Sequence, residues 1–359
     1  MKTEYVKINP KDIPEQALER AGEILRAGGL VAFPTETVYG LGGDAENPEA
    51  ARRIYAAKGR PSDNPLIVHI ADFSQLEAIC DRVPETAEKL ADAFWPGPLT
   101  MIVKKNGRIP TETTGGLDTA AVRFPSHPVA RALIRVSGCM IAAPSANTSG
   151  RPSPTKAIHV REDLDGKIDM IIDGGEVRIG LESTIVDLTD EVPTILRPGY
   201  ISRSDLEQVI GEVRMDPGIL EEHPGVRPKA PGMRYKHYAP KGDLAVVEGG
   251  RQQVVETINR LVREDAARGE HTAVLASDET AALYHAEHVF HMGSRAGEDE
   301  IAARLYDVLR QCDEMHMTKM YSENFDTPRI GQAIMNRLLK AAGHHVITAE
   351  GDAEHEENR

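Results

Sequence analysis

Cysteine is scarce in this 359-residue sequence. The three cysteines, Cys80, Cys139 and Cys312, are far apart and form no CxxC pair. The sequence therefore predicts neither a disulfide framework nor a zinc knuckle. Free cysteine is among the most buried residue types, so we expect three buried thiols.

Long apolar runs are also missing. The longest apolar segments have the length of a strand, which is too short to span a membrane. The first residues, MKTEYVKINPKDIPEQ, include acidic side chains and lack the apolar stretch of a secretory signal. We therefore expect a cytoplasmic protein without a membrane segment.

The chain has no excess of positive charge. It contains 42 Lys and Arg against 56 Asp and Glu, which gives a formal net charge of −14. A broad nucleic-acid-binding surface needs surplus cations to neutralise phosphates, so the balance argues against one and leaves room for a small basic cleft. The length exceeds that of a single hydrophobic core and predicts two domains.

Helix-like and strand-like segments alternate from residue 14 to about 210. Asn47 before Pro48 is typical of a helix start, and Ser74 with Glu77 has the spacing of a capping box. The patterns predict strands at 30–33, 65–70, 99–105, 119–124, 140–146, 183–188 and 193–199, and helices at 14–27, 48–58, 74–80, 85–94, 127–137 and 202–210.

The composition changes after this segment, because the following residues are rich in Pro, Gly and basic side chains, as in a linker. Further segments then alternate as in a small parallel α/β sheet, at 243–248, 252–265, 272–277, 288–293, 298–315 and 328–342. We predict a first domain at 1–211, a linker at 212–242, a second domain at 243–347 and a disordered acidic tail at 348–359.

Three short motifs in the first domain each carry two polar residues separated by one residue. In an extended segment such residues face the same way and could point into one cleft. Each motif taken alone is also typical of an ordinary turn. The pairs are Thr35 with Thr37, Lys58 with Arg60, and Ser145 with Asn147.

Several of these side chains suit an anion. Lys58 and Arg60, close to Asn64, could hold phosphate oxygens, although cations at a helix end also complement its dipole. Arg123 ends the apolar strand TAAV, and a buried arginine requires an anionic partner. A carboxylate or a phosphate would serve.

Other patterns argue against familiar sites. GEVRIGLE has Leu181 where a P-loop needs lysine, and GLGGDA at 40–45 is poorly placed for a dinucleotide fold. His285, His288 and His291 recur at every third residue, but a helix end running into a strand would not keep their rings on one face. His69 could face either a core or a ligand.

Seven sequence blocks together resemble the Sua5 branch of the YrdC/Sua5 family, the threonylcarbamoyl-adenylate synthases. They are FPTETVYGLG, KGRPSDNPLIVHI, FWPGPLT, VRFPSHP, APSANTSGRPSPT, GLESTIVD and ILRPG. They occur in the order of the family, and PGMRYKHYAP is similar to its interdomain linker. The resemblance covers nearly the whole chain.

The resemblance implies an α/β fold: a twisted, mostly parallel YrdC-like sheet with a large positive cavity, then a smaller Rossmann-like Sua5 domain, with the linker covering the active site. It implies a nucleotidyltransferase that converts L-threonine, bicarbonate or CO2 and ATP, with Mg²⁺, to threonylcarbamoyl-AMP and pyrophosphate. This is the first step towards N6-threonylcarbamoyladenosine at position 37 of tRNAs that read codons beginning with A. Downstream tRNA threonylcarbamoyl transferase machinery would use the product, so contact with tRNA would be indirect.

The resemblance also assigns roles to residues at matching positions. For L-threonine these are Thr37, His69, Arg123, Ala143 and Ser183. For ATP they are Lys58, Arg60, Asn64, Thr119, Ser145, Asn147, Ser153, Arg197 and Tyr238, with Lys58 and Arg60 as the catalytic pair and Mg²⁺ held by the ATP phosphates alone. Two alternatives stay open, a module that binds double-stranded RNA and a carbamoyl transferase of hydrogenase maturation, although the acylphosphatase and zinc-finger segments of the latter are missing here.

Overall fold

The computed structural model describes residues 2–14, 16–219 and 238–349. The chain divides into two compact units, Met1–His237 and Tyr238–Arg359, and each is described by itself.

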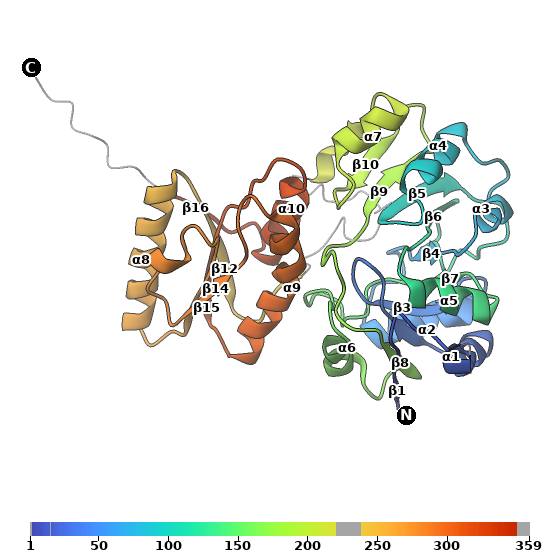
Figure 1. Ribbon diagram of the computed structural model, residues 1–359, viewed down its shortest axis with the longest axis horizontal. Coiled ribbons are helices and arrows are strands. Elements are labelled where there is room, and N and C mark those ends of the chain that lie inside the picture. Colours follow the sequence, from blue (N-terminus) through green and yellow to red (C-terminus); the bar gives the residue numbers. More distant parts are fainter. Residues whose placement is uncertain (1, 15, 220–237, 350–359) are drawn as a thin grey trace, which may run out of the picture. The chain divides into compact units, whose positions relative to one another are not determined.

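The first unit is built on an eleven-stranded sheet with the strand order β1-β8-β2-β3-β7-β4-β6-β5-β9-β10-β11 (Figure 1). Its strands are β1 (Glu4–Lys7), β2 (Val31–Phe33), β3 (Gly40–Asp44), β4 (Ile67–His69), β5 (Leu99–Lys104), β6 (Thr119–Arg123), β7 (Ile141–Ala142), β8 (Met170–Asp173), β9 (Thr184–Asp187), β10 (Thr194–Arg197) and β11 (Arg214–Met215). All seven strands predicted for the first domain are present.

The α/β fold class is confirmed, but this sheet is mixed and not mostly parallel. Five of its neighbouring pairs are parallel. The other five are antiparallel. Short connections explain part of the difference, because β2 joins β3 through residues 34–39 and β9 joins β10 through residues 188–193. Parallel neighbours need a crossover of a dozen or more residues.

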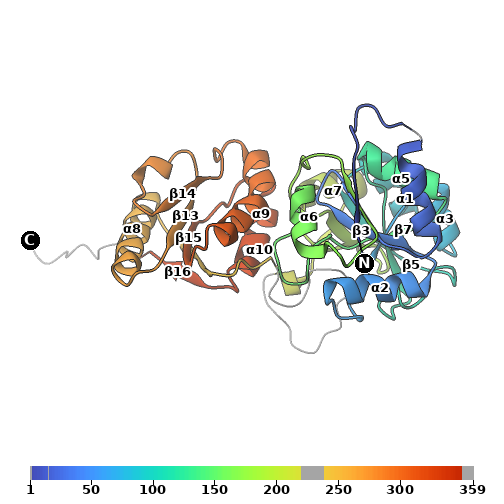
Figure 2. The same ribbon diagram turned by 90° about the horizontal axis from the view of Figure 1, so that it is seen from below.

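Helices cover this sheet in two apolar cores. They are α1 (Gln16–Arg26), α2 (Pro48–Lys58), α3 (Ser74–Ile79), α4 (Glu85–Phe94), α5 (Pro128–Ser137), α6 (Ala157–Leu164), α7 (Arg203–Ile210) and the 3₁₀ turn η1 (Pro217–Ile219). Helices α1 and α5 lie side by side (Figures 1 and 2) and share one core with β2 and β8. Helices α2, α3, α4, α6 and α7 contribute to the other core.

The ends of α2 follow from its sequence. The Asn47 side chain accepts a hydrogen bond from the Glu49 N–H at 3.0 Å, and Pro48 occupies the first turn, as predicted. Gly59 ends the helix with φ 62°, a conformation that glycine adopts at little cost. The cap fixes the direction in which the chain leaves Lys58.

The capping box predicted at Ser74 is wrong. Helix α3 begins at Ser74 itself, and the Asp72 carboxylate accepts the Ser74 N–H at 2.9 Å and its hydroxyl at 2.6 Å. The N-cap position is Phe73, which makes no side-chain cap, and Asp72 one residue earlier satisfies the first free N–H of the helix. A reciprocal capping box is present at Ser202 and Asp205, at the start of α7.

Two further segments differ from the expectation. GLGGD is strand β3, which lies between β2 and β7 inside the sheet. A Cβ at Gly42 would lie 2.7 Å from Ile141 and 2.8 Å from Phe33, so glycine allows the close approach. The linker was expected from residue 212, but β11 pairs with β10 and Ile219 joins the core. The first unit thus extends at least to Ile219, while residues 220–237 lie outside the described residues.

The second unit contains a five-stranded sheet with the order β14-β13-β15-β12-β16, in which all four neighbouring pairs are parallel. Helix α8 lies on one face of it, and α9 and α10 lie on the other (Figures 1 and 2). Its elements are β12 (Asp243–Glu248), α8 (Arg251–Ala267), β13 (Thr272–Ala276), η2 (Ala281–Leu283), β14 (His288–His291), α9 (Glu298–Glu314), β15 (Lys319–Glu323), α10 (Gly331–Ala341) and β16 (Val346–Thr348). The parallel sheet confirms the expected architecture, whereas β15 and β16 were not predicted. Most of the expected acidic tail, residues 350–359, lies outside the described residues.

Three smaller expectations concern cysteine, membranes and histidine. Cys80, Cys139 and Cys312 are buried free thiols, as predicted. Across the residues placed by the structure, no helix is long and apolar enough to cross a membrane. His288 and His291 lie on β14, and His291 is exposed.

Candidate functional site

One face of the first sheet carries several of the residues singled out in the sequence. Along β6, Thr119, Ala121 and Arg123 point to the same side because side chains alternate on a strand. The parallel neighbour β4 places Ile67 beside Ala121 and His69 beside Arg123, and so on the same face. Two predicted threonine contacts, His69 and Arg123, are therefore adjacent.

The same face continues across β5, β9 and β10. Thr100 on β5 lies opposite Arg123, and its hydroxyl is 2.7 Å from the Ser183 hydroxyl. The Arg197 guanidinium donates to the Ser183 carbonyl at 3.1 Å and to its hydroxyl at 3.2 Å. A continuous polar row thus runs from Arg123 to Arg197.

Apolar side chains between these groups form a small cluster of their own, separate from the two main cores. Its members are Ile67, Ile102, Ala121, Ile185 and Leu196. A polar row beside an apolar patch is the usual composition of a ligand-binding surface.

The PTETVYG motif joins this face at Arg123. The Arg123 Nη1 donates to the Thr37 hydroxyl at 2.9 Å, and that hydroxyl is 2.8 Å from the Thr35 hydroxyl. Arg123 Nη2 also lies 2.8 Å from Glu36 Oε1, and both side chains are 5% exposed. The anionic partner that the sequence requires for Arg123 is therefore Glu36, a residue that the sequence reading did not select.

His69 is buried and uncharged at neutral pH. Its Nδ1 lies 3.1 Å from the Ile67 carbonyl oxygen, and its ring meets the Phe33 ring edge to face. Burial, and next the Arg123 charge, lower the pKa of His69 to about 3. The imidazole can therefore line the site as a neutral hydrogen-bonding group and not as a cation.

Lys58, the last residue of α2, is 2% exposed and holds the APSANTSG loop. Its ammonium donates to the carbonyl oxygens of Ser145 and Asn147 at 2.5 Å each. The Ser145 hydroxyl donates to Asn147 Oδ1 at 2.5 Å. The Ser145 backbone also bridges to Gly40, directly after PTETVY. The three motifs are thus brought together around Arg123 and Lys58.

Arg60, Asn64 and Thr119 gather at the other end of β4 and β6. Arg60 donates from Nε to the Asn64 carbonyl at 3.2 Å and from Nη2 to the Pro65 carbonyl at 3.1 Å. Thr119 begins β6, and its parallel neighbour β4 begins at Ile67, two residues after Pro65. Among the described residues, no donor reaches the buried Asn64 Oδ1. Thr119 lies four strand positions from Arg123 on β6, about 13 Å at the usual rise per residue.

Three other predicted residues have different surroundings. The Ala143 N–H donates to the Ile67 carbonyl at 2.8 Å, which keeps Ala143 at the edge of β4. The Ser153 hydroxyl donates to Glu182 at 2.6 Å, next to Ser183. Tyr238 belongs to the second unit, where its ring packs against Tyr306 with centroids 5.1 Å apart. Its role at ATP stays a prediction.

Sequence reasoning missed two groups that support the site. Asp163 on α6 pairs with Arg151 and accepts the Thr148 N–H at 3.1 Å, and so fixes the loop that carries Asn147. Thr100 lies opposite Arg123 on the neighbouring strand, and its hydroxyl contacts that of Ser183. A short acidic helix and a lone threonine gave no pattern that could have identified them.

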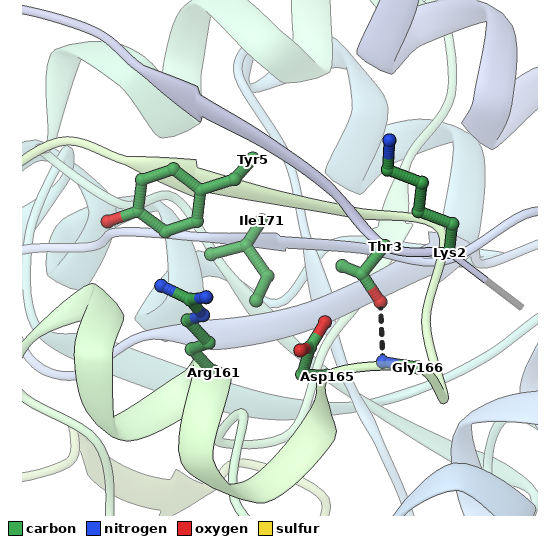
Figure 3. Close-up of a pocket in the computed structure, with 7 residues that line it drawn as sticks. All are labelled: Lys2, Thr3, Tyr5, Arg161, Asp165, Gly166 and Ile171. Atoms are coloured by element: carbon green, nitrogen blue, oxygen red, sulfur yellow. Dashed lines mark hydrogen bonds between the residues drawn. The ribbon is translucent and has the colours of Figure 1, made fainter.

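A hollow of about 530 Å³ lies apart from these residues, between the N-terminal strand β1, strand β8 and α6 (Figure 3). Its lining comprises Lys2, Thr3, Tyr5, Arg161, Asp165, Gly166 and Ile171, and the Thr3 hydroxyl accepts the Gly166 N–H at 2.8 Å. None of these residues was predicted to bind a substrate. Tyr5 is 50% exposed, so the hollow lacks the buried, converging polar groups of the Arg123 face.

Within the described ranges, no three His, Cys, Asp or Glu side chains are grouped so that they could hold a metal ion.

The fold and the site define an α/β protein that gathers buried cations and hydroxyl groups on one face of its larger sheet. The family model Sua5/YciO/YrdC, described as "Telomere recombination", matches residues 23–199. The model described as "Threonylcarbamoyl-AMP synthase, C-terminal domain" matches residues 201–343.

Curated relatives and solved structures agree with these matches. Threonylcarbamoyl-AMP synthase of Bacillus subtilis is 50% identical over 92% of this chain and 94% of its own length. That of Pyrococcus abyssi is 48% identical over 93% and 96%. The crystal structure of Pyrococcus abyssi Sua5 complexed with L-threonine has a TM-score of 0.91 and 46% identity, and covers 98% of this chain and 100% of that one. The chain belongs to the two-domain Sua5 family of threonylcarbamoyl-AMP synthases.

Proposed function

We propose that this protein is an L-threonylcarbamoyladenylate synthase, a nucleotidyltransferase that makes threonylcarbamoyl-AMP and pyrophosphate from L-threonine, CO2 or bicarbonate, and ATP. The observation that carries the proposal is the polar row from Arg123 through Thr100 and Ser183 to Arg197, next to the loop held by Lys58. Membership of the family and a relative solved with L-threonine support it.

The reaction needs no covalent enzyme intermediate. The deprotonated amine of threonine adds to CO2, which forms the N–C bond and releases a proton. A carbamate oxygen then attacks the α-phosphorus of ATP, forming an O–P bond while the bond to the pyrophosphate oxygen breaks. Pyrophosphate leaves with its magnesium ion, which the ATP phosphates bring and for which we assign no protein ligand.

The protein's contribution is positioning and charge stabilisation. Arg123, Thr37 and neutral His69 surround the amino acid, with Ala143 and Ser183 completing its pocket. The nucleotide end of the site is formed by Arg60, Asn64 and Thr119. The region between that end and the amino-acid pocket is formed by Ser145, Asn147, Ser153 and Arg197. Lys58 holds the loop and supplies positive charge to the reacting phosphates.

We place the enzyme in the cytoplasm, at the first step of N6-threonylcarbamoyladenosine formation at position 37 of tRNA. Its product is a mixed anhydride that hydrolyses readily, so a transferase that carries the threonylcarbamoyl group to tRNA must follow it. The protein itself then needs no extended tRNA surface, which agrees with its net charge of −14.

The experiment is to incubate the purified protein with ATP and magnesium and to omit L-threonine or bicarbonate in turn. We expect pyrophosphate release only when both are present. Pyrophosphate release that ignores threonine contradicts the proposal. RNA binding that weakens with salt, without pyrophosphate release, would favour the RNA-binding alternative instead.

A further inference from the structure

Glu36 is a buried carboxylate at the centre of the site to which the proposed reaction assigns no role. It lies between Thr35 and Thr37, and its side chain is 5% exposed. Buried carboxylates are rare unless they are paired, and Glu36 Oε1 lies 2.8 Å from Arg123 Nη2. The pair is therefore held together by charge inside the sheet face that carries His69 and Arg123.

The hydrogen bonds of this pair are incomplete. Arg123 Nη1 donates to Thr37, but Arg123 Nε and Nη2 reach no acceptor with hydrogen-bond geometry among the described residues. Within the same part of the chain, neither carboxylate oxygen of Glu36 accepts a well-aligned donor. Buried polar groups are nearly always hydrogen-bonded, so both side chains have capacity for a ligand.

The free groups match the two charges of an amino acid. The Nε–Nη2 edge of arginine binds a carboxylate through two parallel hydrogen bonds. An α-amino acid carries its ammonium group on the carbon next to that carboxylate, and Glu36 offers acceptors beside the same edge. The ion pair and the zwitterion are both neutral overall, so binding buries no net charge.

The titratable groups near Glu36 do not compete with an ammonium group for its carboxylate. Burial lowers the pKa of His127 and of His69, so neither imidazole adds a competing cation at neutral pH. Burial alone would raise the pKa of Glu36, but the Arg123 charge, and then polar contacts with the Arg123 side chain and with the backbone of Glu36 and Ser126, hold that pKa below its usual range. Glu36 is therefore ionised, and the cation that faces it among the described residues is Arg123.

We propose that Glu36 binds the α-ammonium group of the amino-acid substrate while the free edge of Arg123 binds its carboxylate. The inference rests on the proposed function, because it requires an α-amino acid at this face. Glu36 thereby selects amino acids over hydroxy acids of the same shape.

The test compares two ligands and three proteins by calorimetric binding. The ligands are L-threonine and its analogue of the same configuration in which a hydroxyl replaces the amino group. The proteins are wild type, Glu36→Gln and the control Glu323→Gln. Glu323 on β15 is also a buried carboxylate, 2.7 Å from Arg295, but it belongs to the second unit.

We expect wild type and Glu323→Gln to prefer threonine about 10- to 100-fold, the range of one charge-assisted hydrogen bond. Glu36→Gln should lose most of this preference by weakening threonine alone. If Glu36→Gln does not fold, Glu36→Asp keeps the charge and should retain the preference at lower affinity.

Equal weakening of both ligands in Glu36→Gln, or an unchanged preference in it, would overturn the inference. A Glu36→Asp protein that folds and has no preference would do the same. Wild-type protein that binds neither ligand would contradict the proposed function itself, which is a different result.

Discussion

At the scale of a single residue, a substitution at Arg60 tests its assignment to the catalytic pair. Its guanidinium is held by two backbone carbonyls at 3.2 and 3.1 Å, a planar arrangement that lysine cannot reproduce. We expect Arg60→Lys to lower kcat/KM for ATP about 10- to 100-fold, the equivalent of one lost charge-assisted hydrogen bond. Steady-state pyrophosphate kinetics would measure it.

The matched control is Arg52→Lys on α2, the helix that ends two residues before Arg60. The Arg52 side chain is 56% exposed and pairs with Glu49 and Glu112 at the surface, where ion pairs contribute little. Its kinetics should stay at the wild-type level. Wild-type kinetics in Arg60→Lys would remove Arg60 from the catalytic pair.

His69 makes stability depend on pH with a definite sign. Its pKa is about 3 in the folded protein, mainly through burial, against about 6.5 in an unfolded chain. The unfolded chain therefore binds more protons between these values, and the free energy of unfolding falls as pH drops below about 6.5, by up to about 1.4 kcal/mol per pH unit.

Carboxylates also titrate in part of this pH range. The contribution of His69 is therefore separated from theirs by comparing wild type with a variant that lacks the imidazole. Denaturant unfolding of wild type and His69→Gln from pH 7 to pH 4 should give a shallower loss in the variant. Identical slopes would contradict a buried neutral His69.

At the scale of elements, the C-terminal cap of α2 links stability to the site. Gly59 separates Lys58 from Arg60 and has φ 62°, with open space where a Cβ would lie. Only the backbone conformation should therefore oppose Gly59→Ala, at a cost of about 1 kcal/mol. Because the strain falls between two site residues, kcat should fall as well.

Gly138 is the equivalent cap of α5, with φ 68° and the same open space. Gly138→Ala should therefore lose similar stability and keep wild-type kcat, as measured by thermal unfolding and pyrophosphate release. If both variants kept full kcat, α2 would not position the Lys58–Arg60 pair through its cap.

The elements also show what the sequence could predict. The start of α2 at Asn47 and the strands that carry His69 and Arg123 follow from local signals that the structure confirms. β3 could not be predicted, because glycines weaken a strand locally and only packing against Phe33 and Ile141 explains them. Glu36 was missed because its burial and its contact with Arg123 arise from pairing between distant segments.

At the scale of the whole molecule, the first unit contains every assigned site residue except Tyr238. Within the described residues, the last strand of the sheet is β11, and the core includes Ile219. We expect a chain ending at Ile219 to fold and bind L-threonine but to lose most adenylate formation, because Tyr238 and the second unit are missing. Calorimetry and pyrophosphate release would measure the two properties separately. Full adenylate formation would remove the second unit from the reaction.

The central claim is that carbon from bicarbonate joins threonine to AMP. The most direct measurement is the mass of the adenylate formed from ATP, L-threonine and ¹³C-bicarbonate, together with the amount of pyrophosphate. We expect threonylcarbamoyl-AMP one mass unit heavier than the unlabelled product, in equal amount to pyrophosphate. An adenylate without the label, or pyrophosphate without this adenylate, would contradict it.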